Sequence, residues 1–373
     1  MINILSKKII LKKEYFHKHK EIYEFFQNFS SSISNEDLSK FMTLQHYCEE
    51  NPFYIEQIRW FEELVLQKKQ GFSFSFRIAS LESRNSKESI LGINVKVTRP
   101  SGRTKILKGE FVIFKKNKEW KINDFPFKVI QSDVCSLYYL DGNEDLAQIA
   151  FEYTQKITSY LEEIFNWKPT GVNLKFYTTL EQLSFTIPWF ATYGWHEQRE
   201  SIKIALPYYV KNKEHSLFSM LLHEISHKML SDLSNDNASL YLQEGLAILL
   251  EKGHYIKEGK IYFSEESLYV FHLEVLDNIK VNLNISLDEL NKLTYNDGEM
   301  LYFYGFLLAY YLFKEWGFKI FSSIGNNLSK KNYINARAHT KNVELNKITS
   351  VALKQLLPIN SKFLTLTSFI SEQ

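Results

Sequence analysis

Cysteine is scarce in this chain of 373 residues, which contains two, Cys48 and Cys135. They lie far apart in sequence and outside any metal-binding spacing, so the sequence offers neither a thiolate zinc site nor a disulfide-rich framework. We expect free thiols in a reducing compartment, with a single bridge as the alternative. An excess of one charge is also lacking, because the formal net charge is +2. This balance gives no indication of a polyanionic partner, so we expect no nucleic-acid binding.

Long apolar runs are missing as well. The basic residues near the N-terminus, at 7–8 and 12–13, are not followed by the sustained apolar stretch that a secretory signal requires. The longest apolar segment, at 300–313, is too short to span a bilayer and is rich in tyrosine, so it predicts a helix of the core. These absences predict a cytoplasmic protein without a membrane span.

The most informative motif is a His-Glu-x-x-His segment at 223–227. Its apolar neighbours predict a buried helix. His223 and His227, four residues apart, would share one helix face and could bind one metal ion. Glu224 would project beside that face, where a carboxylate can take a proton from a water bound to zinc. A solvated helix with two histidines is the alternative, but buried imidazoles beside a carboxylate need partners, which a metal supplies.

A second apolar helix, expected at 239–251, offers a third ligand in Glu244. The link at 231–237 is rich in turn and N-cap residues, so the chain can reverse there and lay the second helix on the first. Gly245 is unfavourable in a helix by about 1 kcal/mol, which predicts close approach of another backbone or of the site. We therefore expect His223, His227 and Glu244 to bind one zinc ion (Zn2+) per chain, with an exposed helix glutamate as the alternative for Glu244.

The two helices resemble those of the gluzincin metallopeptidases, specifically the peptidase MA-like group. In the aminopeptidase branch a related Asn-Glu-Gly-x-Ala segment carries the glutamate ligand, and 243–247 stands in that place here. The spacing from His227 to Glu244 is a few residues shorter than in the aminopeptidases or the thermolysin group, which departs from both. The resemblance covers about the last two thirds of the chain and is specific at the two motif helices. It implies a zincin-type domain with a small mixed sheet and a mostly helical C-terminal part.

The resemblance also implies a donor for the oxyanion of the reaction. An aromatic helix at 300–317 ends in an aromatic-glycine pair, as is typical of the group, and the aminopeptidases place a tyrosine three residues before a glycine. Tyr302 with Gly305 fits that placement, with Tyr304 in reserve. A phenol stays neutral at working pH and can donate toward developing negative charge. A core role is the alternative, because the chain has 22 tyrosines.

The segment at 201–207 alternates apolar and polar residues and predicts a strand just before the zinc helix. In gluzincins that strand is usually the sheet edge, to which an extended peptide adds as another strand. The resemblance thus implies that Ile202, Ile204 and Leu206 bind substrate. The chain has no Gly-x-Met-Glu-Asn segment, with which the aminopeptidases grip a free N-terminus. Endopeptidase-like cleavage is therefore expected.

The first third of the chain differs in kind. Helical patterns precede alternating, strand-like segments at 72–76, 93–97, 110–114 and 120–124. Helices followed by a curved antiparallel sheet that ends in Trp-Lys-Ile-x-Asp resemble NTF2-like domains. Such domains hold a small ligand, dimerise or act as spacers. No charged constellation there predicts catalysis, so we expect an accessory role.

The sequence as a whole predicts an α+β zinc metallopeptidase of two domains, 1–132 (NTF2-like) and 133–373 (gluzincin-type). Glu224 would activate the zinc-bound water and later protonate the leaving amine, while zinc and Tyr302 stabilise the oxyanion of a peptide or protein substrate. One alternative is a zinc-fold scaffold or peptide-binding module with little or no turnover. Another is a ligand-binding N-terminal domain beside a structural zinc, which would favour thiol ligands. The sequence carries no signal of oligomeric state.

Overall fold

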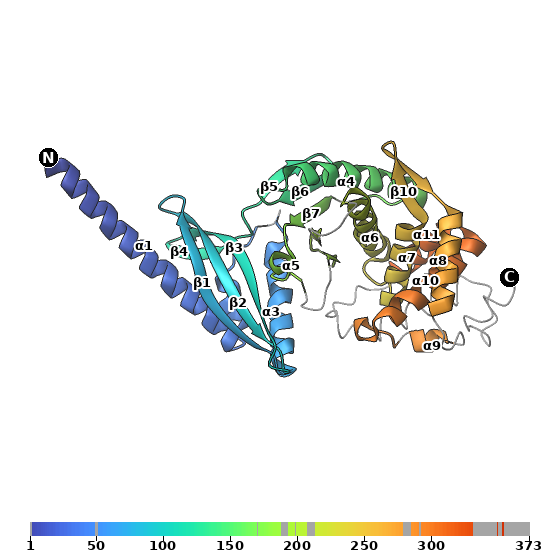
Figure 1. The fold of residues 1–373 in the computed structure, drawn as a ribbon, viewed down its shortest axis with the longest axis horizontal. Helices are drawn as coiled ribbons and strands as arrows, with labels where there is room; N and C mark the ends of the chain where they lie inside the picture. Colours follow the sequence, from blue (N-terminus) through green and yellow to red (C-terminus); the bar gives the residue numbers. More distant parts are fainter. Residues whose placement is uncertain are drawn as a thin grey trace.

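The computed structural model describes residues 2–48, 51–169, 171–187, 193–197, 199–206, 213–278, 285–290 and 292–330, together with residues 349 and 353. It combines helices with antiparallel and mixed sheets, which confirms the α+β class. Two units lie side by side, an N-terminal one and a larger second one that contains the His-Glu-x-x-His helix (Figure 1).

Three helices and a four-stranded antiparallel sheet form the N-terminal unit. They are α1 (Ile2–Ser34), α2 (Leu38–Thr43), α3 (Phe53–Lys69) and, in sheet order, β1 (Ser73–Ser83), β2 (Glu88–Thr98), β3 (Thr104–Lys116) and β4 (Glu119–Ile122). Alternate residues of β2, including Leu91, Ile93 and Val95, are buried in one core with Trp60 and Leu64 of α3. The predicted strands are confirmed in position. Most of them run further than predicted, because the hairpins continue through polar residues beyond the apolar alternation.

A five-stranded mixed sheet is the framework of the second unit. Its order is β5 (Lys128–Gln131), β6 (Cys135–Tyr139), β7 (Val172–Tyr177), β9 (Ile202–Ala205) and β8 (Gly194–Trp195). The three central strands are parallel, and β5 and β8 are antiparallel to their neighbours. The helix α4 (Glu144–Phe165) supplies the crossover that parallel β6 and β7 require. Because β5 belongs to this sheet, residues 128–131 group with the second unit, close to the predicted boundary at 132/133.

Both faces of β7 and β9 are buried. On one face Leu174, Ile202 and Ile204 belong to the core formed with α4 and with α6 (Lys213–Ser234), which carries the His-Glu-x-x-His motif. On the other face Lys175 and Lys203, which are opposite each other in the register, point toward α3. The second sheet is thus enclosed between its own helices and the N-terminal unit.

Helices make up the rest of the second unit. They are α5 (Leu180–Leu183), α7 (Leu240–Gly253), α8 (Glu265–Asn278), α9 (Leu287–Leu290), the 3-10 turn η1 (Tyr295–Asp297), α10 (Glu299–Trp316) and α11 (Lys319–Leu328), joined by a hairpin of β10 (His254–Lys257) and β11 (Lys260–Phe263). The chain reverses between α6 and α7 at Asn235 and Asp236, which both adopt positive φ. The predicted close approach at Gly245 is confirmed, since a Cβ there would overlap the backbone of Gly305 on α10.

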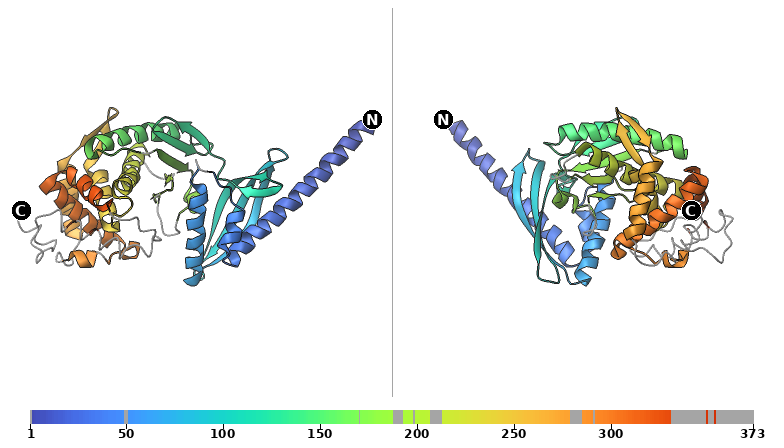
Figure 2. Two further views of the ribbon diagram at one scale, coloured as in Figure 1. Left: turned by 180° about the vertical axis from the view of Figure 1, so that it is seen from behind. Right: turned by 45° about the vertical axis from the view of Figure 1, so that its right-hand side comes forward.

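The two units share an apolar core instead of being joined by a bare linker. Both ribbon views place α3 between the four-stranded sheet and the second unit (Figure 2). The indole nitrogen of Trp60 donates to the backbone oxygen of Ser184 over 3.0 Å, and the Gln57 amide donates to that of Phe185 over 3.0 Å. The aromatic side chain of Phe185 is buried in the N-terminal core. Among the helices described, none is long and apolar enough to cross a membrane.

Candidate metal centre

The two histidines of the motif face the same way on α6. Leu221, Leu222 and Ile225 are fully buried around them, so the helix is anchored in the core and its orientation is fixed. The ring centroids of His223 and His227 lie 4.8 Å apart. This placement, one turn apart on a rigid helix, is what the sequence spacing predicted.

Glu244 reaches the histidines from α7, which is packed against α6. Its Oε2 lies 3.4 Å from Nε2 of His223 and 3.7 Å from Nε2 of His227. One donor atom from each of the three residues falls within 4.8 Å of the others, so this "metal cluster" of His223, His227 and Glu244 could hold one ion. In a tetrahedral zinc site with bonds of about 2.0–2.2 Å, ligand atoms lie about 3.3–3.6 Å apart. The separations from Glu244 to the two histidines, 3.4 and 3.7 Å, lie close to that range.

Hydrogen bonding within the metal cluster is incomplete. Oε2 of Glu224 is buried without a hydrogen-bond partner, and Oε2 of Glu244 has the imidazole nitrogens of His223 and His227 near it, at 3.4 and 3.7 Å. An unpaired buried polar atom costs about 1–3 kcal/mol, so these two carboxylate oxygens beside the imidazoles favour a cation at this place. Two imidazoles and one carboxylate, with no thiol, form the donor set of a catalytic zinc, which keeps its fourth position for water or substrate. The residues present therefore fit zinc.

The pKa values of the two imidazoles are shifted in opposite directions. Burial lowers the pKa of His227 to about 4, which keeps this ring neutral and its lone pair available for a metal. Burial also lowers the pKa of His223, but hydrogen bonds to Glu244 and Glu251 outweigh it and leave that pKa well above its ordinary value. A bound divalent cation would displace the extra proton, because metal ligation requires the neutral ring.

Two supporting residues were not predicted from the sequence. Oε2 of Glu251 lies 3.0 Å from Nδ1 of His223 and so fixes the tautomer and orientation of the ring, an arrangement that recurs around zinc-bound histidines. The Tyr295 hydroxyl donates to Oε1 of Glu244 over 2.9 Å. Glu251 follows Glu244 by seven residues, so the two-turn spacing on one helix face was a usable signal. Tyr295 lies on the three-residue turn η1, whose sequence has no periodicity to mark it.

Glu224 sits where a general base would be required. It is buried beside the metal cluster, and the backbone of β8 passes directly over it, since a Cβ on Gly194 would overlap its Oε1. Burial raises the pKa of Glu224 to about 8. A cation bound at the metal cluster would lower this pKa, because positive charge favours the carboxylate form.

Tyr302 is half-buried on α10 and is electrostatically linked to the site. Burial and the nearby carboxylates of Glu244 and Glu224 raise the pKa of its phenol, so it remains a proton donor at neutral pH. Tyr304, the reserve candidate, is 1% exposed and belongs to the apolar core, and no cluster carboxylate contributes to its pKa shift. The structure therefore favours Tyr302 over Tyr304 as the phenol of this site.

Comparisons with known proteins do not assign a family. No protein-family model matches the chain, and no curated protein sequence is significantly similar to it. Function is therefore inferred from the donor atoms, burial and geometry of the site itself.

The predicted substrate strand needs a correction. Ile202, Ile204 and Leu206 are buried in the core of the second unit, on the face covered by α4 and α6. Their strand, β9, lies between β7 and β8 and is not the sheet edge. The edge strand on this side is β8, whose Gly194 lies against Glu224. Any peptide added to the sheet beside the metal cluster would therefore align along β8.

Proposed function

We propose that this protein is a zinc-dependent peptidase that hydrolyses peptide bonds at the metal cluster. The observation that carries the proposal is that one donor atom from each of three residues lies within 4.8 Å of the others, beside the buried Glu224. Zinc, when bound, acidifies water and polarises a peptide carbonyl. The gluzincin resemblance of the two motif helices points to the same chemistry.

Three residues around the metal cluster would have separate roles in the proposed hydrolysis. Glu224 would accept a proton from the attacking water and hand it to the leaving nitrogen, because a cation at the metal cluster would favour its carboxylate form. Tyr302 would donate a hydrogen bond to the oxygen that gains negative charge. Gly194 on β8 would align the peptide main chain beside Glu224, because its lack of a side chain leaves the backbone close to that carboxylate.

The proposal is tested by Glu224→Gln, which removes the base and keeps the shape and the metal ligands. We expect kcat for a peptide-library substrate to fall by about 10²–10⁴-fold while zinc stoichiometry stays at the wild-type value. Glu214→Gln is the matched control, because Glu214 is an exposed residue in the first turn of the same helix. A Glu224→Gln protein that cleaves peptides at the wild-type rate would show that the mechanism is wrong. A wild type that holds zinc and cleaves no peptide would favour the scaffolding alternative.

A further inference from the structure

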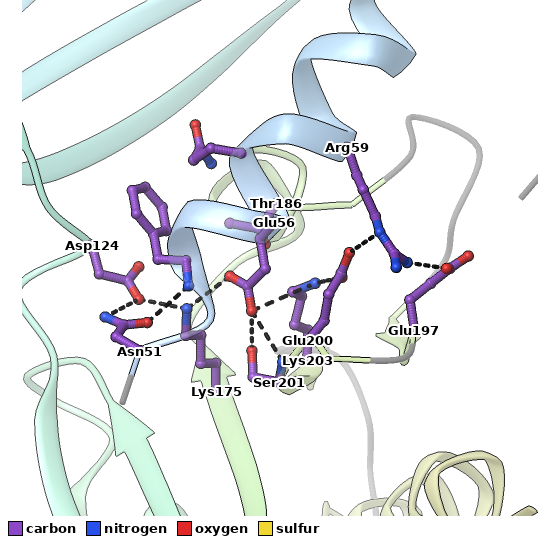
Figure 3. A network of polar contacts seen from close by, with 12 residues as sticks. Asn51, Glu56, Arg59, Asp124, Lys175, Thr186, Glu197, Glu200, Ser201 and Lys203 are labelled. Carbon is purple, nitrogen blue, oxygen red and sulfur yellow. Dashed lines mark hydrogen bonds and ion pairs between the residues drawn. The ribbon is translucent and has the colours of Figure 1, made fainter. Parts of the chain in front are cut away.

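A single arginine of the N-terminal unit holds both ends of the connection between β8 and β9. Arg59 projects from α3, and its guanidinium contacts Oε2 of Glu197, just after β8 (Figure 3). Its Nε lies 3.1 Å from Oε1 of Glu200, just before β9. The Glu200 side chain is 2% exposed and that of Arg59 31%, so the carboxylate of this ion pair is shielded from water and the guanidinium is partly exposed. Arg59 of the N-terminal unit thus binds residues on both sides of the connection between β8 and β9, namely Glu197 and Glu200.

Glu56, one turn before Arg59, fixes the start of β9. Its Oε1 accepts from the backbone nitrogen of Ser201 over 3.1 Å and from the Ser201 hydroxyl. Its carboxylate also pairs with the two lysines of the sheet, at 2.7 Å to Lys175 and 3.7 Å to Lys203. Burial alone would raise the pKa of Glu56, but the two ammonium groups outweigh it and lower the pKa to about 2. The carboxylate is therefore charged at neutral pH and holds the strand firmly.

The segment held in this way leads directly to the metal centre. Gly194 of β8 lies against Glu224. The ring centroid of Trp195, the next residue, lies 5.8 Å from that of Tyr295, which donates to the ligand Glu244. A shift of β8 would therefore move the wall beside the general base and disturb the support of a metal ligand.

We propose that Arg59 is a positioning residue for β8, so that the N-terminal unit completes the peptide-binding wall of the second unit. This inference rests on the proposed function. Arg59 would act through Glu197, Glu200 and β8. An arginine suits the role because its planar fork reaches two carboxylates at once, whereas a lysine ammonium is a single point of charge. The predicted accessory role of the N-terminal unit is thereby given a mechanism.

The test compares Arg59→Gln and Arg59→Lys with the control Arg84→Gln. Arg84 forms an exposed ion pair with Glu88 in the β1–β2 hairpin of the same unit, so its loss measures only a general effect of removing an arginine. Four quantities are measured on the full chain: zinc per chain, melting temperature, kcat and KM for one peptide, and hydrogen exchange of the segment 193–206. A variant that folds poorly has a lower melting temperature and faster hydrogen exchange throughout the chain. A variant that only misplaces β8 has faster exchange in the segment around β8 and β9.

For both Arg59 variants we expect KM to rise about tenfold, kcat to change less than KM, and zinc content to stay at the wild-type value. Exchange should quicken in 193–206 and stay unchanged in the β2–β3 hairpin. Arg84→Gln should match the wild type in all four quantities. If Arg59→Gln fails to fold, Glu197→Gln replaces it, because this variant removes one contact and leaves the guanidinium on Glu200.

The outcomes separate the two hypotheses. If the wild type cleaves peptides and the Arg59 variants keep its KM, the inference is overturned and the proposed function stands. The same conclusion follows if exchange quickens in 193–206 but KM does not change. A wild type that holds zinc and cleaves no peptide overturns the proposed function and the inference together.

Discussion

Two groups of buried ionisable side chains lie on either side of β8 and β9, and they differ in how completely their charges are paired. The "inter-unit network" joins the N-terminal unit to the second sheet and consists of Glu56, Asp124 and Glu200 with Lys175, Lys203 and Arg59 (Figure 3). With Glu197, which also pairs with Arg59, four carboxylates face three cations there. The metal cluster with Glu224 contains two carboxylates and two imidazoles, and it leaves buried acceptor atoms without a partner.

The difference distinguishes a structural cluster from a site that needs a ligand. In the inter-unit network every charge has an opposite charge within 4.0 Å, so the protein itself compensates the loss of hydration. In the metal cluster one donor atom from each of three residues lies within 4.8 Å of the others, so the cluster could hold a cation. Perturbed pKa values occur in both groups of side chains, so they do not distinguish the two groups. The geometry of the donor atoms and the pairing of buried polar atoms identify the candidate functional site.

Breaking the inter-unit network should have the largest effect on stability. Lys175→Met leaves Glu56 and Asp124 buried without their shared cation, and we expect the free energy of unfolding to fall by about 3–5 kcal/mol. Denaturant unfolding measures this loss. Lys96→Met, at an exposed position of β2, is the control and should change stability little. Neutralising both acids in the Lys175→Met background should restore part of the loss, and the absence of any recovery would contradict the pairing described here.

Removing the hydroxyl of Tyr302 should affect chemistry without affecting structure. We expect Tyr302→Phe to lower kcat by about 10²–10³-fold, with zinc content and unfolding free energy close to those of the wild type. Tyr304→Phe is the comparison on the same helix, and its kcat should stay within a few-fold of the wild type. Equal kcat values for the two variants would show that the Tyr302 hydroxyl has no role in the reaction.

The contact between Glu251 and His223 should make a smaller contribution, through metal affinity. Glu251→Gln weakens the hydrogen bond that orients the ligand ring, and we expect zinc affinity to fall about 10–100-fold. Competition with a chromogenic chelator measures the change. Glu266→Gln, an exposed glutamate at the start of α8, should keep the wild-type affinity. A Glu251→Gln affinity equal to that of the wild type would mean that the ring is oriented by the helix alone.

Local spacing made the centre of the metal site predictable. His223, Glu224 and His227 are placed by one helix, and Glu244 with Gly245 required only that the chain reverse once. The supporting contacts depend on how helices cross, which the sequence pattern does not specify. Glu251 meets His223 across the α6–α7 contact, and Tyr295 reaches Glu244 from a turn 51 residues later.

The mistaken edge strand has a comparable cause. The edge position was implied by the gluzincin resemblance, and the alternation of apolar and polar residues at 201–207 agreed with a strand that has one solvated face. In the structure the polar face of β9 is buried, because Glu56 of α3 and Glu200 pair with Lys203. Glu56 precedes Ser201, which it also binds, by 145 residues, so no local pattern could have revealed the cover.

Metal content tests the central claim most directly. Elemental analysis of the untagged protein should find one zinc per chain in the wild type and in His215→Ala, whose histidine is exposed on the first turns of α6. His227→Ala should contain none, because it removes one of three ligands from the metal cluster. A gently purified wild type that contains no metal and takes up no zinc would contradict the account, as would a His227→Ala protein that still holds one zinc per chain.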